Sequence, residues 1–123
     1  MHDFRRLQVW TEARKLAVAI DGLTRSFPRS DRAVIAGQLR RSALSIPSNI
    51  AEGCGKGSRK ETVRFLQIAA GSSTETENHL LIACDLGYLT PVEREKHLDT
   101  LRSIQRMLIA LMRKLITEEP AAR

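Results

Sequence analysis

The chain has 123 residues, with 20 Lys and Arg against 14 Asp and Glu, which gives a formal charge of +6 at pH 7. This length predicts one domain, and an apolar fraction of 42% with 28% charged residues excludes a disordered chain. Its aromatic residues are only three Phe, one Trp and one Tyr, which predicts a helical protein with an aliphatic core rather than a β-sandwich or barrel.

The sequence carries no recognisable targeting or membrane segment. Residues 1–6 are mixed and polar where a signal peptide would turn apolar, and no apolar run approaches the ~20 residues of a membrane span. We therefore expect a cytoplasmic protein with no membrane partner. The two cysteines, Cys54 and Cys84, are too few for a disulfide framework, and about 26 helical residues would separate them by ~39 Å. We expect two buried free thiols.

A first helix is predicted over residues 7–27. Apolar side chains recur there in steps of four and three, the spacing of a helix packed along a bundle axis. They are Val9, Ala13, Leu16, Ile20, Leu23 and Phe27. Pro28 prevents this helix from continuing.

A second helix is predicted over residues 31–53, with Ser30 and Asp31 as capping residues. Pro47 lies inside its pattern, so we expect a kink rather than an end of the helix. The apolar stripe is Ile35, Leu39, Ala43, Ile46 and Ile50. The glycine-rich run 53–57 then predicts a loop.

The third helix is predicted over residues 58–87. Ser58 and Glu61 have the spacing of a capping box at its start. Gly87 provides a left-handed stop at its end. Its predicted core stripe is Val63, Leu66, Ala70, Ser73, Leu80 and Cys84.

The fourth helix is predicted over residues 91–117, from a second capping box at Thr90 and Glu93 with Pro91 at the first helical position. Its apolar face is Leu98, Leu101, Ile104, Leu108, Leu111, Met112 and Leu115. Pro120 and small residues predict a loose tail. Short connections between neighbouring helices imply that residues 1–123 form one all-α, antiparallel, up-down four-helix bundle.

The second and third helices carry apolar or small residues on the face opposite their core stripe as well. A helix face in contact with water is normally charged, and one four-helix chain cannot cover both faces of two helices. The residues concerned are Ala33, Gly37, Leu44, Ser48 and Ala51 in the second helix, and Ile68, Gly71, Ile82 and Leu86 in the third. We therefore expect a homo-oligomer; a monomer with a weakly charged surface is the alternative.

Two glutamates of the third helix need partners if they are buried, because Glu77 falls within its core stripe and Glu75 on the opposite face. Antiparallel pairing of the second and third helices about residue 56 places Arg40 opposite residue 72, one turn from Glu75. We predict that Arg40 or Arg41 pairs with Glu75 or Glu77, within one subunit or between subunits. The role of this pairing would be structural rather than catalytic.

No catalytic or metal-binding pattern is present in the sequence: HExxH, GxSxG and zinc-spaced Cys and His residues are all absent. The pairs Glu75/His79 and Glu93/His97 are four residues apart, whereas di-iron bundles use a spacing of three, so we expect exposed polar contacts. The run 55–58 lacks the residues of a phosphate-binding loop on both sides of its lysine. We therefore expect a non-enzymatic protein with no cofactor and no metal site.

Basic residues crowd the start of the third helix, where the helix dipole is already positive. They are Lys56, Arg59, Lys60 and Arg64. Their placement costs a few tenths of a kcal/mol per charge, which a bound anion would offset. We predict that they contact nucleic-acid phosphates, with weak sequence specificity because no aromatic residue is interleaved with them to stack bases. A second candidate is the outward face of the fourth helix, with Arg102, Arg106 and Arg113, whose charge order also suits the helix dipole without any ligand.

Several runs of this sequence strongly resemble the four-helix bundle family of proteins encoded in 23S ribosomal RNA intervening sequences. The resemblance covers roughly residues 7 to 89, and its most specific part is the run from Ser45 to Gly53. The matching runs include Leu7-x-Val9-Trp10, Gln38-Leu39-Arg40-Arg41-Ser42-Ala43, Ser45-Ile46-Pro47-Ser48-Asn49-Ile50-Ala51-Glu52-Gly53, Ser58-x-Lys60-Glu61, Glu75-x-Glu77 and Leu86-Gly87-Tyr88-Leu89. Thr76 departs from the pattern, because a leucine is usual beside the paired glutamates.

The resemblance implies an antiparallel four-helix subunit that assembles into a ring-like homopentamer. It also implies kinship with the accessory protein of diversity-generating retroelements, a pentameric barrel that engages a reverse transcriptase and nucleic acid. We therefore expect a non-enzymatic oligomeric scaffold that binds RNA or another nucleic acid through phosphate contacts. The alternative is a protein-interaction adaptor that docks a polymerase or another protein partner, with the charge only steering the encounter.

Overall fold

The computed structural model describes residues 3–28 and 32–118. The predicted cap at Ser30 and Asp31, the side chain of Ala33 and the predicted tail at Pro120 lie outside what it describes. A short 3-10 turn, η1 (Phe4–Arg6), precedes four long helices. These are α1 (Gln8–Thr24), α2 (Arg32–Cys54), α3 (Arg59–Asp85) and α4 (Pro91–Thr117).

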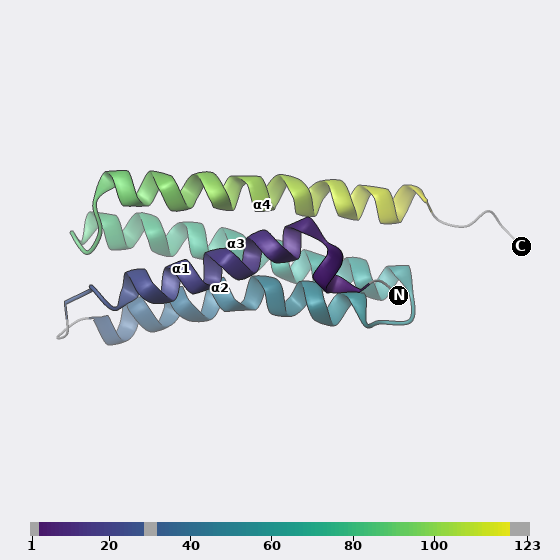
Figure 1. The fold of residues 1–123 in the computed structure, drawn as a ribbon, viewed down its shortest axis with the longest axis horizontal. Coiled ribbons are helices and arrows are strands. Elements are labelled where there is room, and N and C mark those ends of the chain that lie inside the picture. Colours follow the sequence, from purple (N-terminus) through teal and green to yellow (C-terminus); the bar gives the residue numbers. More distant parts are fainter. Residues whose placement is uncertain (1–2, 29–31, 119–123) are drawn as a thin grey trace, which may run out of the picture.

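The four helices form an antiparallel bundle, and the described residues include no strand (Figure 1). Each helix packs against two neighbours, α1 against α2 and α4, and α3 against α2 and α4. The predicted all-α, antiparallel four-helix architecture is therefore confirmed. The α2–α3 turn lies at the same end of the bundle as the end of α4, which brings the start of α3 close to the last residues of α4 (Figure 1).

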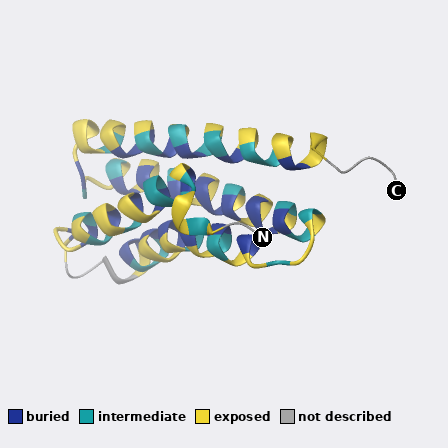
Figure 2. Cartoon of the chain, turned by 45° about the vertical axis from the view of Figure 1, so that its right-hand side comes forward, coloured by how far each residue is buried: buried dark blue, intermediate teal, exposed yellow. Residues whose placement is uncertain are grey.

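The apolar stripes predicted for α1, α2 and α4 form the core, as Figure 2 shows by the buried residues turned toward the bundle interior. Three of the predicted core residues are only half-buried, namely Leu23, Leu111 and Met112. Pro47 is buried, and α2 continues through it from Arg32 to Cys54. The proline therefore does not end the helix.

The core face of α3 differs from the predicted stripe. Val63, Ala70 and Cys84 are only half-buried. The buried face is rotated toward α2 and contains Thr62, Phe65, Leu66, Ala69, Ser72, Ser73, Thr76, Leu80 and Ala83. Small hydroxyl residues are buried there because α2 presents serines opposite them: Ser45 Oγ lies 2.8 Å from Ser72 Oγ, and Thr76 Oγ1 lies 2.9 Å from Ser42 Oγ. The spacing of apolar residues alone does not predict this face, because several of its buried residues carry hydroxyl groups.

The helix ends follow the local chemistry of their sequence. Thr90 and Glu93 form a full capping box at the start of α4, and Gly87 adopts a φ of 80° after α3, a conformation that favours glycine. At the start of α3, Ser58 Oγ accepts the amide hydrogen of Glu61 at 3.2 Å. The Glu61 carboxylate lies against Arg64.

Neither cysteine forms a disulfide. Cys54 is buried at the end of α2, whereas Cys84 is only half-buried, so the expectation of two buried thiols holds for one of them. Burial raises the pKa of the Cys54 thiol. Within residues 3–28 and 32–118, none of the helices combines the length and the apolar character needed to cross a bilayer.

Candidate nucleic-acid interface

The turn between α2 and α3 sets the positions of the basic residues predicted to bind phosphate. It is held by a close contact, in which Thr62 Oγ1 donates to the carbonyl oxygen of Gly53 at 2.9 Å. A β-carbon added to Gly53 would lie 2.9 Å from Cβ of Phe65, so only glycine lets α2 approach α3 this closely. These two contacts hold the turn that carries Lys56 and the start of α3, from which Arg59, Lys60 and Arg64 extend.

The ring of Phe65 makes cation–π contacts with two of these cations, Lys56 and Arg64. Lys56 Nζ lies 4.9 Å from the centre of its ring, and Arg64 Cζ lies 4.7 Å from the same centre. Phe65 itself is only 8% exposed. An aromatic residue therefore does lie beside this cluster, but its buried ring contacts the cations and offers no surface for stacked bases, as expected from the sequence.

The same two cations are partly neutralised by acidic neighbours. Lys56 Nζ lies 3.8 Å from a carboxylate oxygen of Glu52, and Arg64 Nη2 lies 3.3 Å from one of Glu61. Such exposed ion pairs are weak. The carboxylates of Glu52 and Glu61 nevertheless compete with an external phosphate for these two cations.

Arg59 and Lys60 differ from their neighbours, because no ion pair involves either of them in the described part of the chain. Lys60 is exposed, and Arg59 is half-buried. The Arg59 Nη1 atom is shielded from solvent and has no hydrogen-bond partner among the described residues. A shielded donor without a partner is unfavourable, so turning the Arg59 side chain outward onto an external acceptor would remove this cost.

Three of the four cations line a groove between the start of α3 and the end of α4, which we call the α3–α4 groove. Its volume is about 490 Å³. It is lined by Arg59, Lys60, Glu61, Val63, Arg64, Gln67, Leu115 and Ile116. Lys56 does not line it. The groove therefore joins a cationic rim to an aliphatic wall, which the sequence alone did not indicate.

The three arginines predicted on α4 as a second phosphate-binding set differ in whether they form ion pairs. Arg102 Nη1 lies 3.3 Å from Asp99 and 3.7 Å from Glu95, so two carboxylates occupy it. Arg106 and Arg113 are exposed and take part in no ion pair given by the described residues. Arg113 precedes Ile116 by one helical turn, so it lies at the same end of the bundle as the α3–α4 groove.

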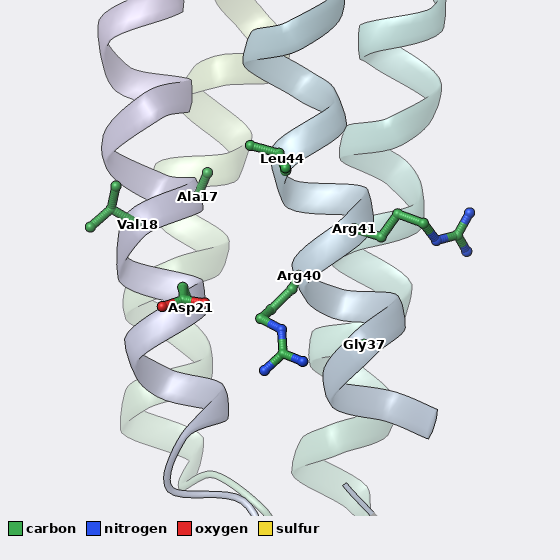
Figure 3. A pocket seen from close by; sticks show the side chains of 7 residues that line it. All are labelled: Ala17, Val18, Asp21, Gly37, Arg40, Arg41 and Leu44. Carbon is green, nitrogen blue, oxygen red and sulfur yellow. The ribbon is translucent and has the colours of Figure 1, made fainter. Parts of the chain in front are cut away.

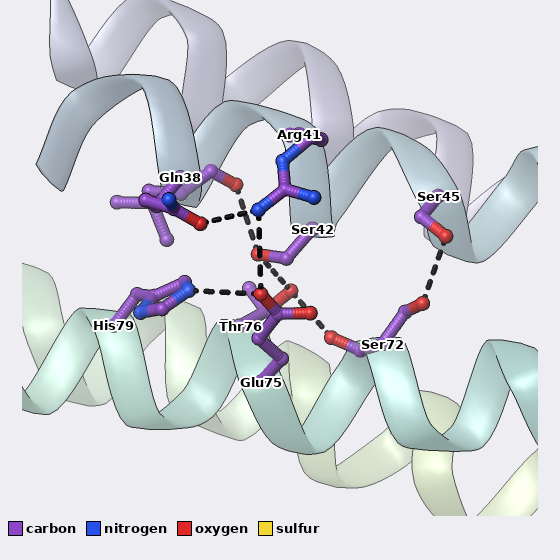
Figure 4. A network of polar contacts seen from close by, with 9 residues as sticks. Gln38, Arg41, Ser42, Ser45, Ser72, Glu75, Thr76 and His79 are labelled. Carbon is purple, nitrogen blue, oxygen red and sulfur yellow. Dashed lines mark hydrogen bonds and ion pairs between the residues drawn. The ribbon is translucent and has the colours of Figure 1, made fainter. Parts of the chain in front are cut away.

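Two of the four predicted structural residues, Arg41 and Glu75, contribute to a polar network between α2 and α3 (Figure 4). Arg41 Nη2 lies 3.8 Å from Glu75 Oε2 within the subunit, and it also donates to Gln38. His79 Nε2 lies 3.3 Å from the same glutamate oxygen. The Glu75 side chain is 44% exposed in the single subunit, so the core of the bundle does not bury it.

Arg40 and Glu77 do not join that network. Arg40 Nη1 donates to Thr24 Oγ1 of α1 at 3.3 Å, and Glu77 Oε1 accepts from Gln105 Nε2 of α4 at 3.2 Å. Arg40 also lines a second groove, between α1 and α2, of about 620 Å³. Figure 3 shows Arg40 and Asp21 in this groove, and Arg41 turned away from α1. Its aliphatic residues Val18 and Leu44 are 69% and 60% exposed.

The two histidines predicted to make exposed contacts are largely buried. The His79 side chain is 14% exposed and His97 is 8% exposed. Burial lowers the pKa of His97, the charge of Lys96 lowers it further, and Glu93 opposes both effects. Among the described residues, no three His, Cys, Asp or Glu side chains come together in the way that a metal site requires.

The comparison with protein families decides the identity of the chain. The family described as 23S rRNA-intervening sequence protein matches residues 5–110. The chain belongs to this family. The match extends beyond the stretch on which the sequence resemblance rests and includes most of α4.

A solved structure supports the same assignment. The chain is similar to a protein of unknown function from the S23 ribosomal protein family of Bacteroides thetaiotaomicron, with 28% identity and a TM-score of 0.78. The alignment covers 85% of this chain and 97% of that one. No curated protein matches the chain. Family and neighbour thus agree on the fold and bring no evidence of an enzyme, and their function is unknown.

Proposed function

We propose that this protein is a non-enzymatic, homo-oligomeric helical scaffold that acts in the cytoplasm and binds RNA or another nucleic acid through phosphate contacts. The observation that carries the proposal is the position of Arg59 and Lys60 and their lack of acidic partners among the described residues. Both lie at the start of α3, where the helix dipole favours an anion. If the Arg59 side chain turned outward onto a phosphate, Nη1 would gain the hydrogen-bond partner that it lacks in its shielded position.

The neighbouring cations extend the same surface. Lys56 and Arg64 rest on Phe65, which restrains both side chains and lowers the entropy lost when they bind. Arg106 and Arg113 add charge along α4, although we place them second to the α3 cluster. With a formal charge of +6 per chain, assembly would multiply the basic surface.

The proposed assembly accounts for the apolar side chains that a single subunit leaves uncovered. Leu44 of α2 and Leu86 of α3 are 60% and 55% exposed, and Ile68 and Ile82 of α3 are each 41% exposed. These positions are those at which the outer faces of the two helices were expected to need a second subunit. A ring-like homopentamer, implied by the family resemblance, is the arrangement that we propose.

The proposal is tested by removing the two cations without acidic partners. We expect Arg59→Gln with Lys60→Gln to weaken binding of a fluorescently labelled RNA about tenfold at low salt. The control is Lys15→Gln with Arg25→Gln, which removes the same charge from exposed positions of α1 and of its C-terminal end. Unlike Arg59 and Lys60, Arg25 has an acidic partner, since its Nη2 lies 2.8 Å from Asp21. The control variant is expected to bind within about twofold of the wild type.

Two results would contradict this function. An equal loss of affinity in both variants would show that only the net charge matters. If the wild type binds no RNA even at low salt, the alternative takes over, and the protein is an adaptor that docks a polymerase or another protein partner.

A further inference from the structure

The α3–α4 groove combines two kinds of surface that a simple phosphate site does not need. The α3 side carries the cations Arg59, Lys60 and Arg64, together with Glu61 and Val63. The α4 side carries the aliphatic side chains of Leu115 and Ile116. Ile116 is 58% exposed although it borders a groove of about 490 Å³. A ligand that matches both sides must place an anion beside a flat or apolar group.

Arg59 is one of the cations that line the groove. Its Nη1 is shielded from solvent and lacks a hydrogen-bond partner among the described residues. A guanidinium group can donate to a phosphate through its edge and stack against a nucleobase through its planar face. One side chain can therefore contact both parts of the same nucleotide.

We propose that the α3–α4 groove receives one unpaired nucleobase, with the flanking phosphate on Arg59 and Lys60, so that the protein binds single-stranded nucleic acid more tightly than a duplex. The inference rests on the proposed function and names its substrate class. In a duplex the bases are stacked inside the helix, so the backbone reaches the cations but nothing fills the groove. In a single strand the base can leave the stack and cover the aliphatic wall.

An acidic amphipathic helix of a protein partner fits this groove less well. A docked helix uses apolar anchors along two turns, at positions i, i+3, i+4 and i+7. The α4 side of the groove offers only the adjacent residues Leu115 and Ile116, and the exposed residue that follows them is Thr117. This short wall matches a single base better than a helix.

The test compares a short unstructured RNA with the duplex that it forms with its complement, at the same salt concentration. We expect the wild type to bind the single strand about tenfold more tightly. Ile116→Ser should remove most of this preference and leave the duplex affinity within about twofold of the wild type. The control is Ile109→Ser, which changes an isoleucine of α4 that is 48% exposed and does not line the groove, and it should keep the full preference.

The outcomes separate this inference from the function on which it rests. Equal affinities for single strand and duplex, both weakened by Arg59→Gln with Lys60→Gln, would overturn the base-binding groove and leave the phosphate site standing. A preference that survives Ile116→Ser would overturn the groove as well, as would displacement of the RNA by an acidic amphipathic peptide that binds more tightly than the single strand. No binding of either nucleic acid would overturn the proposed function itself.

Discussion

Gly53 and Phe65 determine how closely α2 and α3 approach each other below the basic cluster. The glycine leaves room for the Phe65 side chain, and its carbonyl oxygen accepts the hydrogen bond from Thr62. The ring then supports Lys56 and Arg64. A change at one residue of this contact should therefore affect both the stability of the bundle and the placement of its cations.

Gly53→Ala is expected to destabilise the protein by about 1–3 kcal/mol, because the added methyl group would meet Phe65 Cβ at 2.9 Å and the carbonyl oxygen of Thr62 at 3.3 Å. The control is Gly22→Ala in α1, where nothing lies within 4 Å of the added carbon. That variant should gain about 0.5 kcal/mol, because alanine favours the helix. Urea denaturation measures both changes, and equal stability of the two variants would contradict the close contact.

His97 makes folding sensitive to pH. Its pKa in the folded protein lies below the ordinary value of 6.5, chiefly because the ring is buried. The unfolded chain therefore binds a proton more readily, and the contribution of this group to stability falls as the pH drops through 6.5 toward the lower pKa of the folded state. An NMR titration of the folded protein should give a midpoint below 6.5 for His97. A midpoint at or above that value would contradict the burial of the ring.

The pairing of α2 with α3 shows what helical periodicity can predict and what it cannot. The stripe of α2 from Ile35 to Ile50 was readable because its buried residues are apolar. On α3, however, Ser72 and Thr76 look like surface residues until the serines of α2 are placed opposite them. Whether a hydroxyl is buried depends on the partner helix and its register, and one sequence segment does not contain that information.

The hydroxyl of Thr76 is expected to stabilise the pairing of α2 with α3. Its Oγ1 is buried 2.9 Å from Ser42 Oγ and 2.8 Å from the carbonyl oxygen of Ser72. We expect Thr76→Val to cost about 1–2 kcal/mol in the free energy of unfolding, because it removes the hydroxyl and keeps the shape of the side chain. Thr74→Val, at an exposed position where the hydroxyl also faces a carbonyl one turn back, should cost less than about 0.5 kcal/mol.

A double-mutant cycle separates the contact from its surroundings. The combination of Thr76→Val with Ser42→Ala should cost less than the sum of the two single changes, by about 0.5 kcal/mol or more. Additive costs would show that the two hydroxyls do not interact.

At the scale of the whole molecule, the uncovered apolar faces of α2 and α3 predict self-association. The wild type should have a mass that is a multiple of 13.8 kDa in light scattering. Leu44→Asp should yield the monomer with unchanged helix content, because it places a charge where a second subunit would bury an aliphatic side chain. Val92→Asp changes a residue that is 80% exposed on α4 and should keep the assembly. A monomeric wild type would contradict the proposed oligomer.

Only the part of the candidate site whose residues are close together in the sequence could be predicted. Arg59, Lys60 and Arg64 lie within two turns of one helix, so their clustering is visible in the sequence. The aliphatic wall of the groove comes from Leu115 and Ile116, which meet α3 only because the bundle is antiparallel. The sequence does not indicate a role for Phe65, because its position beneath two cations depends on side-chain packing.

The salt dependence of RNA binding tests the central claim most directly. For a single strand, each phosphate contact contributes about 0.7 to the slope of log K against log salt concentration. Removing Arg59 and Lys60 with Arg59→Gln and Lys60→Gln should therefore reduce the slope by about 1.4, while Lys15→Gln with Arg25→Gln leaves it unchanged. The same slope in all three proteins would contradict phosphate binding at the start of α3.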